Sequence, residues 1–428
     1  MKVLIISGVP IRTDTNSGKT LKNLFSDFAP EELSQLYFSP ETPNTDLCGD
    51  YYRVCEKQML KSCFGLRRSK CGGVATPVQT GEIAVNPERN PLVLTKNKRA
   101  IHIRLARELV WSLTHWKNAG LKAWLKKQNP DVILAVMQDT NGATKAIRWV
   151  ARQTGCPVVY YITDDYYNDP ENSGHFLRKR YFWKRQRLNK ALSGSVRAVT
   201  GCSGKMTDYF RKELNIPTGE PVFTPSNPDY LALPAHEQKP GGVVTIRYFG
   251  NLGLGRWQQL KNLGTVIQKI NLGGQKAILE VYSSDRDPNT HRELTIENGC
   301  VFKGWVHGEE YLSLLQSADI AVHVESFDES MIRRTWGSVS TKIADYLGAG
   351  KCVLAIGSPE LASIEHLQDV ACVISDLEKL EEQLTALIED PARREKLQCK
   401  ARELAIRCHD LDTIGTQVRT ILETACIK

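Results

Sequence analysis

The sequence predicts an α/β protein made of two doubly wound, Rossmann-like domains that face each other across a cleft. Its 428 residues exceed what one hydrophobic core organises, so two domains of about 200 residues are expected. Short apolar runs rich in β-branched residues alternate with helical segments in both halves, as in parallel sheets covered by helices. A polar segment rich in Pro and Gly, SNPDYLALPAHEQKPGG, separates the halves.

The apolar runs place the strands, and the segments between them are expected to be helical. In the first half the predicted strands are Lys2–Ser7, Val132–Val136, Val158–Thr163 and Val196–Thr200. In the second half they are Val244–Phe249, Ala277–Tyr282, Cys300–Phe302, Ile320–Val324, Cys352–Ile356 and Val370–Ile374. Residues 376–428 are predicted to be helical throughout.

These elements divide the chain into an N-terminal domain, 1–226, a linker, 227–242, and a C-terminal domain, 243–405. The helix predicted over 406–428 is expected to pack back on the N-terminal domain. Ligands of doubly wound sheets bind at the carboxyl ends of the strands, so we expect the site in the cleft between the domains.

The overall composition is that of an ordinary globular protein with a basic balance. Hydrophobic residues make up 41%, charged residues 24%, and the net charge is +8, which favours an anionic partner or surface. The start, MKVLIISGVP, lacks a cleavable leader pattern, and no run approaches the roughly 20 apolar residues of a membrane helix. We therefore expect a cytoplasmic protein. The twelve cysteines lack the C-x2–4-C pairs of structural zinc, so no metal is predicted.

Residues 338–359, SVSTKIADYLGAGKCVLAIGSP, predict an anion site. A hydroxyl-rich turn leads into a short helix, and a helix N-terminus presents unpaired N–H groups and partial positive charge. Ser340 or Thr341 can cap this helix, and Lys342 adds a full charge. The arrangement suits a diphosphate; the plain alternative is an ordinary capped helix.

A glycine-rich loop, YFGNLGLGRWQQLKN, follows the first strand of the second domain. Gly250, Gly253 and Gly255 allow the backbone to approach a ligand, and Arg256 and Lys261 supply charge to phosphate oxygens. The spacing is G-x-x-G-x-G rather than the dinucleotide fingerprint G-x-G-x-x-G. A nicotinamide enzyme is therefore disfavoured, and a glycine turn without ligand remains the alternative.

The first domain contains an incomplete phosphate-loop pattern. Gly18-Lys19-Thr20 matches its end, but Thr13 stands where the first glycine should be, so nucleotide hydrolysis is not predicted. Ser17 and Gly18 are nevertheless predicted to open a helix N-terminus that faces the cleft.

Basic residues concentrate in Lys96–Lys127 and Arg178–Lys190. Interleaved among them are Trp111, Trp116, Trp124 and Trp183. Basic helices with aromatic residues suit an interface with anionic lipids. A solvated helix face is the plain alternative, and nucleic acid is not expected because no known nucleic-acid module is visible.

In the order of its motifs the chain resembles a GT-B glycosyltransferase, close to the retaining group called glycosyltransferase family 4. The resemblance rests on the segments PDVILAVM, PVVYYITDD, GCSGKMTDYF, TPSNPDYL, YFGNLGLGR, CVFKGWVHGEEYLSLLQSADIAVHVE and STKIADYLGAGKCVLA. It implies a nucleotide-sugar donor held mainly by the second domain and an acceptor held by the first. It also implies that no metal or other cofactor is obligatory.

The resemblance assigns donor contacts residue by residue. Arg256 and Lys261 correspond to the pair that binds the diphosphate, and Ser340, Thr341 and Lys342 lie at the phosphate-facing helix start. In the run FKGW, Phe302 and Gly304 lie where backbone meets the nucleobase, and Asp345 occupies the position that meets the ribose. These eight residues, with Ser17, Gly18 and Gly253, are the predicted donor-binding set.

The predicted catalytic residues are Asp164, His175, Glu325 and Glu329. Gly337 stands where the family has its first motif glutamate, so Glu325 and Glu329 are the candidates for its sugar-contacting role. Asp164-Asp165, with His175 further on, stands where many members carry a histidine. A general base at that position would imply inversion of the anomeric configuration of the sugar, whereas a mere polar contact there would imply retention. The resemblance favours retention.

The resemblance implies a hexosyltransferase that builds a surface polysaccharide or glycolipid on a lipid-linked or glycan acceptor, at the inner face of the cell membrane. The same-fold alternatives are a nucleotide-sugar epimerase and a phosphorylase. The alternative of another class is a non-catalytic protein that binds membranes or nucleic acid.

Overall fold

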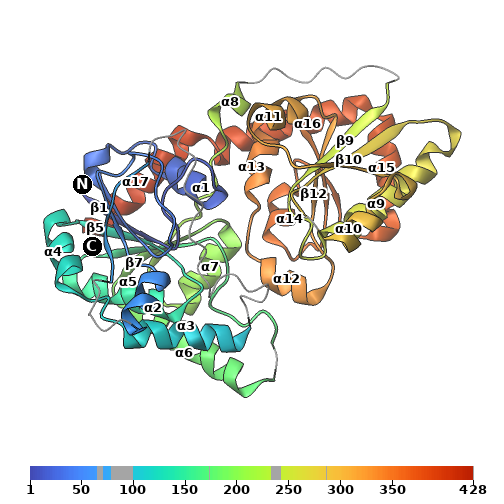
Figure 1. Cartoon of the computed structure of the whole chain (residues 1–428). Helices are drawn as coiled ribbons and strands as arrows, with labels where there is room; N and C mark the ends of the chain where they lie inside the picture. The colour runs from blue at the N-terminus through green and yellow to red at the C-terminus, as the bar shows by residue number, and fades with distance from the viewer. Residues whose placement is uncertain (65–70, 79–99, 173, 233–241, 286, 428) are drawn as a thin grey trace. The chain divides into compact units, whose positions relative to one another are not determined.

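The computed structural model describes residues 1–64, 71–78, 100–172, 174–232, 242–285 and 287–427, which form two compact units. Unit 1 comprises Met1–Val222 with Ile414–Lys428, and unit 2 comprises Phe223–Thr413. Each unit contains one sheet with helices on both faces (Figure 1). Most of the predicted linker, residues 233–241, lies outside the described residues.

The sheet of unit 1 has eight strands in the order β4-β3-β2-β1-β5-β6-β7-β8. They are β1 (Val3–Ser7), β2 (Leu33–Tyr37), β3 (Asp50–Arg53), β4 (Gly73–Ala75), β5 (Val132–Val136), β6 (Val158–Ile162), β7 (Val196–Gly201) and β8 (Thr218–Gly219). Among the strands that the structure describes, β3 and β4 pair antiparallel and the other pairs are parallel. The predictions of β1, β5, β6 and β7 are confirmed. The sequence analysis missed the other four because they are short or interrupted by polar residues.

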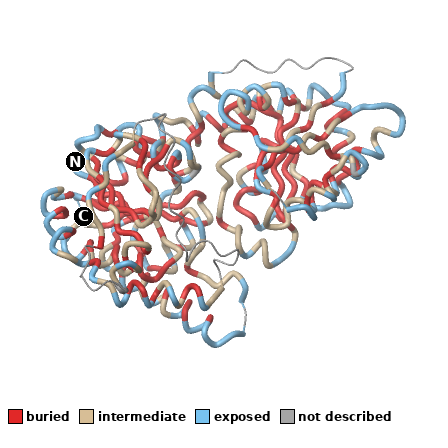
Figure 2. Tube along the Cα trace, viewed as in Figure 1, coloured by how far each residue is buried: buried red, intermediate tan, exposed pale blue. Residues whose placement is uncertain are grey.

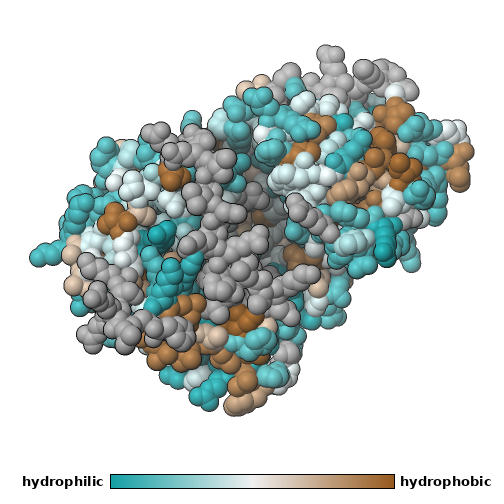
Figure 3. Space-filling view, in the orientation of Figure 1, coloured by the Kyte–Doolittle hydropathy of each residue, from teal (hydrophilic) through white to brown (hydrophobic). Residues whose placement is uncertain are grey.

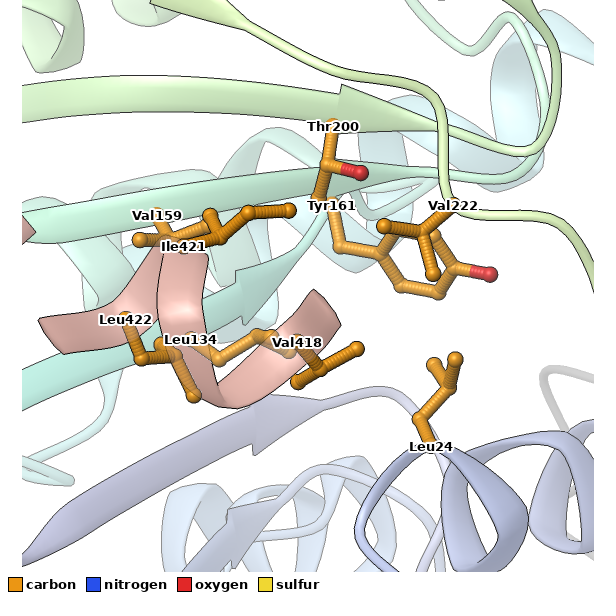
Figure 4. Close-up of a pocket in the computed structure, with 9 residues that line it drawn as sticks. All are labelled: Leu24, Leu134, Val159, Tyr161, Thr200, Val222, Val418, Ile421 and Leu422. Atoms are coloured by element: carbon orange, nitrogen blue, oxygen red, sulfur yellow. The ribbon is translucent and has the colours of Figure 1, made fainter. Parts of the chain in front are cut away.

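Helices cover both faces of this sheet. They are α1 (Asn16–Leu24), α2 (Glu56–Phe64), α3 (Ile101–Leu113), α4 (Ala119–Gln128), α5 (Asn141–Thr154), α6 (Phe176–Ser193), α7 (Gly204–Glu213) and most of α17 (Leu411–Ile427), with a 3-10 turn at Pro30–Glu32. Figure 4 shows a small apolar cavity where α17 packs on the strands, with Val418, Ile421 and Leu422 opposite Leu134 and Val159. The C-terminal helix is thus part of the core of unit 1.

The sheet of unit 2 has six parallel strands in the order β11-β10-β9-β12-β13-β14. They are β9 (Val244–Phe249), β10 (Ala277–Tyr282), β11 (Cys300–Gly304), β12 (Ile320–Val324), β13 (Cys352–Ile356) and β14 (Cys372–Ile374). In chain order this is 3-2-1-4-5-6, the doubly wound arrangement. All six strands were predicted, because strands buried on both faces appear in the sequence as continuous apolar runs.

The remaining helices pack around this second sheet. They are α8 (Pro228–Leu231), α9 (Arg256–Ile270), α10 (Pro288–Glu293), α11 (Gly308–Gln316), α12 (Glu329–Thr335), α13 (Thr341–Gly348), α14 (Ala362–Leu367), α15 (Leu380–Glu389) and α16 (Pro391–Cys408), with 3-10 turns at Asn271–Gly273, Ile296–Asn298 and Leu377–Lys379. Two apolar clusters, one on each face of the sheet, form the core. Figure 2 shows the strands buried in both units. No helix in the described ranges is long and apolar enough to cross a membrane.

Candidate functional site

The candidate site lies where the second sheet reverses its winding, between β9 and β12. In doubly wound sheets the loops that leave such a pair of strands diverge and open a crevice at their carboxyl ends. The loop Gly250–Gly255 follows β9, and the loop Glu325–Asp328 follows β12. A Cβ atom on Gly255 would collide with the Ser326 side chain, so the two loops lie against each other.

The glycine loop has an unusual backbone that starts helix α9 abruptly. Gly250 has φ 151°, and the successive residues Leu254 and Gly255 have φ 59° and 77°. A positive φ is uncommon for leucine and is retained where the surroundings impose it, often near functional sites. The Tyr248 hydroxyl donates a 2.6 Å hydrogen bond to the carbonyl of Asn251, which ties the loop to β9.

Arg256, the first residue of α9, forms a two-point ion pair with Glu325, the first residue after β12. Its Nη2 donates to Oε1 at 2.7 Å and its Nε to Oε2 at 3.2 Å. The two side chains are only 16% and 5% exposed. The Glu325 carboxylate raises the pKa of Arg256 although burial opposes this. The fold therefore joins two residues, 69 positions apart, that the sequence analysis assigned separately.

Lys342 brings a second positive charge to the same place from helix α13. Its Nζ lies 5.6 Å from the centre of the Tyr248 ring, and a Cβ atom on Gly250 would overlap this ammonium group. Burial, and next the charge of Arg256, lower the pKa of Lys342 to about 8, against the opposing effects of Glu325 and Asp345. The Lys342 side chain makes no hydrogen bond to any residue that the structure describes.

His323, near the end of β12, is a member of this cluster that the sequence analysis missed. Its Nε2 is buried, lies 3.7 Å from Glu325 Oε1, and has no hydrogen-bond partner among the described residues. Burial, with the charges of Arg256 and Lys342, lowers the pKa of His323 to about 3, so the ring is neutral at pH 7. A polar residue inside the apolar run IAVHV was the signal that could have identified it.

The N-terminus of α13 is built differently from the prediction. Ser340 occupies the cap position, but its side chain makes no capping hydrogen bond, and Thr341 is the first helical residue. The expectation that a hydroxyl caps this helix through its side chain is therefore wrong for Ser340. Within the cap, the Ile343 N–H donates a 3.0 Å hydrogen bond to the Ser340 carbonyl, whereas the Ser340 side chain satisfies none of the first-turn N–H groups.

The predicted ribose and base positions lie beside the two apolar clusters of unit 2: Tyr311, the partner of Asp345, packs on one, and Phe302 packs on the other. Asp345 Oδ2 accepts a 3.2 Å hydrogen bond from the Tyr311 hydroxyl. The Phe302 ring packs against the core and against His291, with ring centres 4.3 Å apart. Gly304, at φ 81°, accepts a 2.7 Å hydrogen bond from the Ser283 amide.

Three other predicted residues of unit 2 have different surroundings. Lys261 pairs with Glu293 of α10, and both side chains are about 40% exposed. Glu329 begins α12, is 88% exposed and pairs with Arg333 one turn further on. The Gly253 amide donates a 2.6 Å hydrogen bond to the Asn251 side chain.

The predicted residues of unit 1 lie in three separate places. Ser17 and Gly18 are in the first turn of α1, where the Gly18 amide donates to the capping Thr15 hydroxyl at 3.3 Å. A Cβ on Gly18 would meet the Arg12 backbone, which explains the glycine. Asp164 follows β6 and accepts a 3.3 Å hydrogen bond from the Tyr166 hydroxyl. His175 is the exposed residue that precedes α6.

The basic, aromatic segments prove to be partly internal. Trp111, Trp116 and Trp124 are each 4% exposed and belong to the core, so their expected place at a lipid interface is wrong. Arg178 is also buried and pairs with Asp169 and Glu171. Residues 96–99 lie outside the described residues. Large apolar side chains remain exposed on α3 and α6, namely Leu109, Leu113, Phe176, Leu177 and Trp183.

We call the exposed side of α3 and α6 the α3–α6 face. Along α6, Phe176, Arg180, Trp183 and Arg187 recur at helical spacing and are all exposed, and the Arg187 guanidinium lies 4.8 Å from the Trp183 ring centre. The Lys184–Glu108 ion pair joins the two helices. Figure 3 shows apolar and hydrophilic surface side by side in the region of these helices.

Comparison with known proteins agrees with this architecture. A family model described as glycosyl transferase-like matches residues 244–420, which include the whole cluster around Arg256. No curated protein matches the chain in sequence.

Several solved glycosyltransferases share the fold over the whole chain. Anabaena HepE in complex with UDP has a TM-score of 0.62 at 13% identity, over 99% of this chain and all of that one. A Rickettsia africae glycosyltransferase has a TM-score of 0.59 at 14% identity, over 99% and 98%. The UDP-forming trehalose-phosphate synthase of Burkholderia xenovorans has a TM-score of 0.59 at 10% identity, over 99% and 100%. At these identities the likeness establishes the α/β fold of two doubly wound units.

Proposed function

We propose that this protein is a glycosyltransferase that moves a sugar from a nucleotide-sugar to an acceptor. The observation that carries the proposal is the pair of cations, Arg256 and Lys342, at the switch point of the second sheet. Two positive charges held together in a partly buried place repel each other, and an anion bound between them removes that cost. The glycosyl transferase-like match over 244–420 and the UDP bound by HepE support a nucleoside diphosphate as this anion.

In this proposal the second unit holds most of the donor. Arg256, Lys342 and the N–H groups at Ser340 and Thr341 meet the diphosphate, whereas Asp345 meets the ribose. The backbone around Phe302 and Gly304 meets the base. We keep Lys261, Gly253, Ser17 and Gly18 in the donor-binding set as the sequence assigns them.

The chemistry needed is stabilisation of a leaving group. When the bond between sugar and diphosphate breaks, negative charge grows on the diphosphate oxygens. Fixed donors aimed at a developing charge are often the largest contribution to catalysis. Arg256, Lys342 and the α13 N-terminus would supply such donors, and no obligatory metal or other cofactor is part of the proposal.

For the catalytic step we propose the residues that the sequence assigns to it, which come from both units. Asp164 and His175 belong to unit 1, and Glu329 belongs to unit 2. Glu325 already binds Arg256 with both carboxylate oxygens.

We propose hexosyl transfer with retention of the anomeric configuration. The anomeric configuration of the isolated product is the test.

Thermal unfolding in the presence of nucleotides tests the donor proposal. We expect one nucleoside diphosphate and its sugar derivatives to raise the melting temperature, because a ligand at 100 times its Kd stabilises the folded state by about 2.7 kcal/mol. The matching donor should then release nucleoside diphosphate in the presence of an acceptor extract. If no nucleotide or nucleotide-sugar shifts unfolding, the proposal is wrong. Epimerised donor without transfer would favour the epimerase alternative.

We also propose that the acceptor is lipid-linked and that the α3–α6 face attaches the protein to an anionic membrane, in surface polysaccharide or glycolipid assembly. Trp183 and Phe176 would enter the headgroup region while Arg180 and Arg187 meet lipid phosphates. Each interfacial basic residue contributes about 1 kcal/mol, so a few suffice for reversible attachment.

Vesicle sedimentation at low salt tests this attachment. The wild type should bind vesicles that contain anionic lipid and be released as salt screens the charges. The variant Arg180→Gln/Trp183→Ser/Arg187→Gln should bind several-fold more weakly, because all three side chains are exposed. The control Lys379→Gln/Lys396→Gln removes two exposed charges from the other unit and should bind like the wild type. Equal binding of neutral and anionic vesicles would contradict the proposal.

A further inference from the structure

The Arg256–Glu325 pair uses only one edge of the guanidinium group. Both hydrogen bonds to the carboxylate come from Nε and Nη2. The opposite nitrogen, Nη1, has no hydrogen-bond partner among the residues that the structure describes. A guanidinium group carries five N–H donors in a rigid plane, so fixing one edge also fixes the direction of the other.

Glu325 is itself firmly placed. It follows β12 directly, its amide donates a 2.8 Å hydrogen bond to the carbonyl of Ile356, and its side chain is 5% exposed. His323, 3.7 Å away, is neutral at pH 7 and provides no competing positive charge. The charge of Glu325 is therefore directed to Arg256 and, at longer range, to Lys342.

We propose that Glu325 is a positioning residue: it holds the Arg256 guanidinium so that the free Nη1 edge, together with the Lys342 ammonium, is presented to the donor diphosphate. This inference rests on the proposed function of the site. It assigns Glu325 a role through Arg256, in place of a direct contact with the sugar. A long arginine side chain that is already ordered loses less freedom when its ligand binds.

The opposite arrangement is that Glu325 acts as an internal anion that competes with the diphosphate for Arg256. In that case the carboxylate would have to leave before the ligand could bind. The free Nη1 edge argues against it, because an anion can reach that edge while the Glu325 contact is intact. The two arrangements predict opposite effects of removing the carboxylate charge.

Calorimetric titration with inorganic pyrophosphate distinguishes them. We expect Glu325→Gln to weaken pyrophosphate binding at least 10-fold at pH 7. A glutamine side chain has only one accepting oxygen, so it can hold only one of the two guanidinium N–H groups and does not fix the plane of the guanidinium. In the Arg256→Ala background the same substitution should cost less than 2-fold, because Glu325 then has no arginine to orient. Glu325→Asp, which keeps the charge on a shorter side chain, should bind between the two.

The pH dependence of pyrophosphate binding gives a second test, because it would not change if Glu325 served only to stabilise the fold. The groups whose charges act on Lys342 are Arg256, which lowers its pKa, and Glu325 and Asp345, which raise it. In the wild type, pyrophosphate binding should weaken as pH rises through about 8, because Lys342 loses its proton. Without the Glu325 charge, this pKa falls further, so in Glu325→Gln the decline should begin at lower pH.

The outcomes separate this inference from the proposed function. Absence of pyrophosphate and nucleotide binding by the wild type would overturn both. Binding by the wild type that is weakened in Arg256→Ala, but unchanged or tighter in Glu325→Gln, would overturn this inference alone. If Glu325→Gln does not fold, as judged by circular dichroism, Glu325→Asp provides the same comparison with the charge retained. Binding by Glu325→Asp as tight as in the wild type, in that case, would overturn the inference.

Discussion

Alanine substitution of Arg256 or Lys342 is expected to weaken binding of a nucleoside diphosphate about 10- to 100-fold. Each substitution removes a hydrogen bond between a charged donor and phosphate, worth about 1.5–3 kcal/mol. Both cations are largely buried, so solvent and salt screen them little. Calorimetric titration with pyrophosphate and with the nucleoside diphosphate should show the same loss for both ligands, because the lost contacts are to phosphate.

The matched comparisons lie on the same helix, α9. Lys269→Ala removes an exposed lysine that pairs with Glu381, and it should leave binding unchanged. Lys261→Ala tests whether Lys261 binds the ligand, because the sequence assigns Lys261 to the diphosphate whereas the structure pairs it with Glu293. A loss as large as that of Arg256→Ala would show that Lys261 exchanges Glu293 for the ligand. Full affinity in both Arg256→Ala and Lys342→Ala would contradict the donor site.

Gly250→Ala is expected to weaken pyrophosphate binding at least as much as Lys342→Ala does. The added Cβ would overlap the Lys342 ammonium, and the end of a lysine side chain is flexible enough to be pushed away. The backbone at φ 151° is also a conformation that alanine rarely adopts, which we expect to cost about 1–3 kcal/mol of folding free energy. Titration measures the first effect, and thermal or urea unfolding measures the second.

Two controls separate displacement of Lys342 from a general glycine effect. Gly273→Ala adds a Cβ in open space in the same unit and should change neither binding nor stability appreciably. In the Lys342→Ala background, Gly250→Ala should cause little further loss of binding, because the group that it displaces is gone. A large additional loss there would mean that Gly250 acts by another route, such as the path of the loop itself.

The sequence by itself determined much of the architecture. The strands of the second sheet are apolar along their whole length because both faces are buried, so their positions could be read directly. Arg256 and Lys342 were also assigned to the donor site from sequence, since a glycine loop and a helix start are local features. Of the four strands missed in unit 1, β2 and β3 lie in segments whose polar residues hide the strand pattern.

Only the tertiary structure decided which charged side chains meet. Glu325 and Arg256 are far apart in the chain and come together because β9 and β12 are neighbours in the sheet. The same holds for Lys342 over Gly250, and for the tryptophans of α3 and α4, which the fold turns into the core. Composition and spacing describe what a segment contains, whereas burial and ion pairing depend on which segments the sheet order makes adjacent.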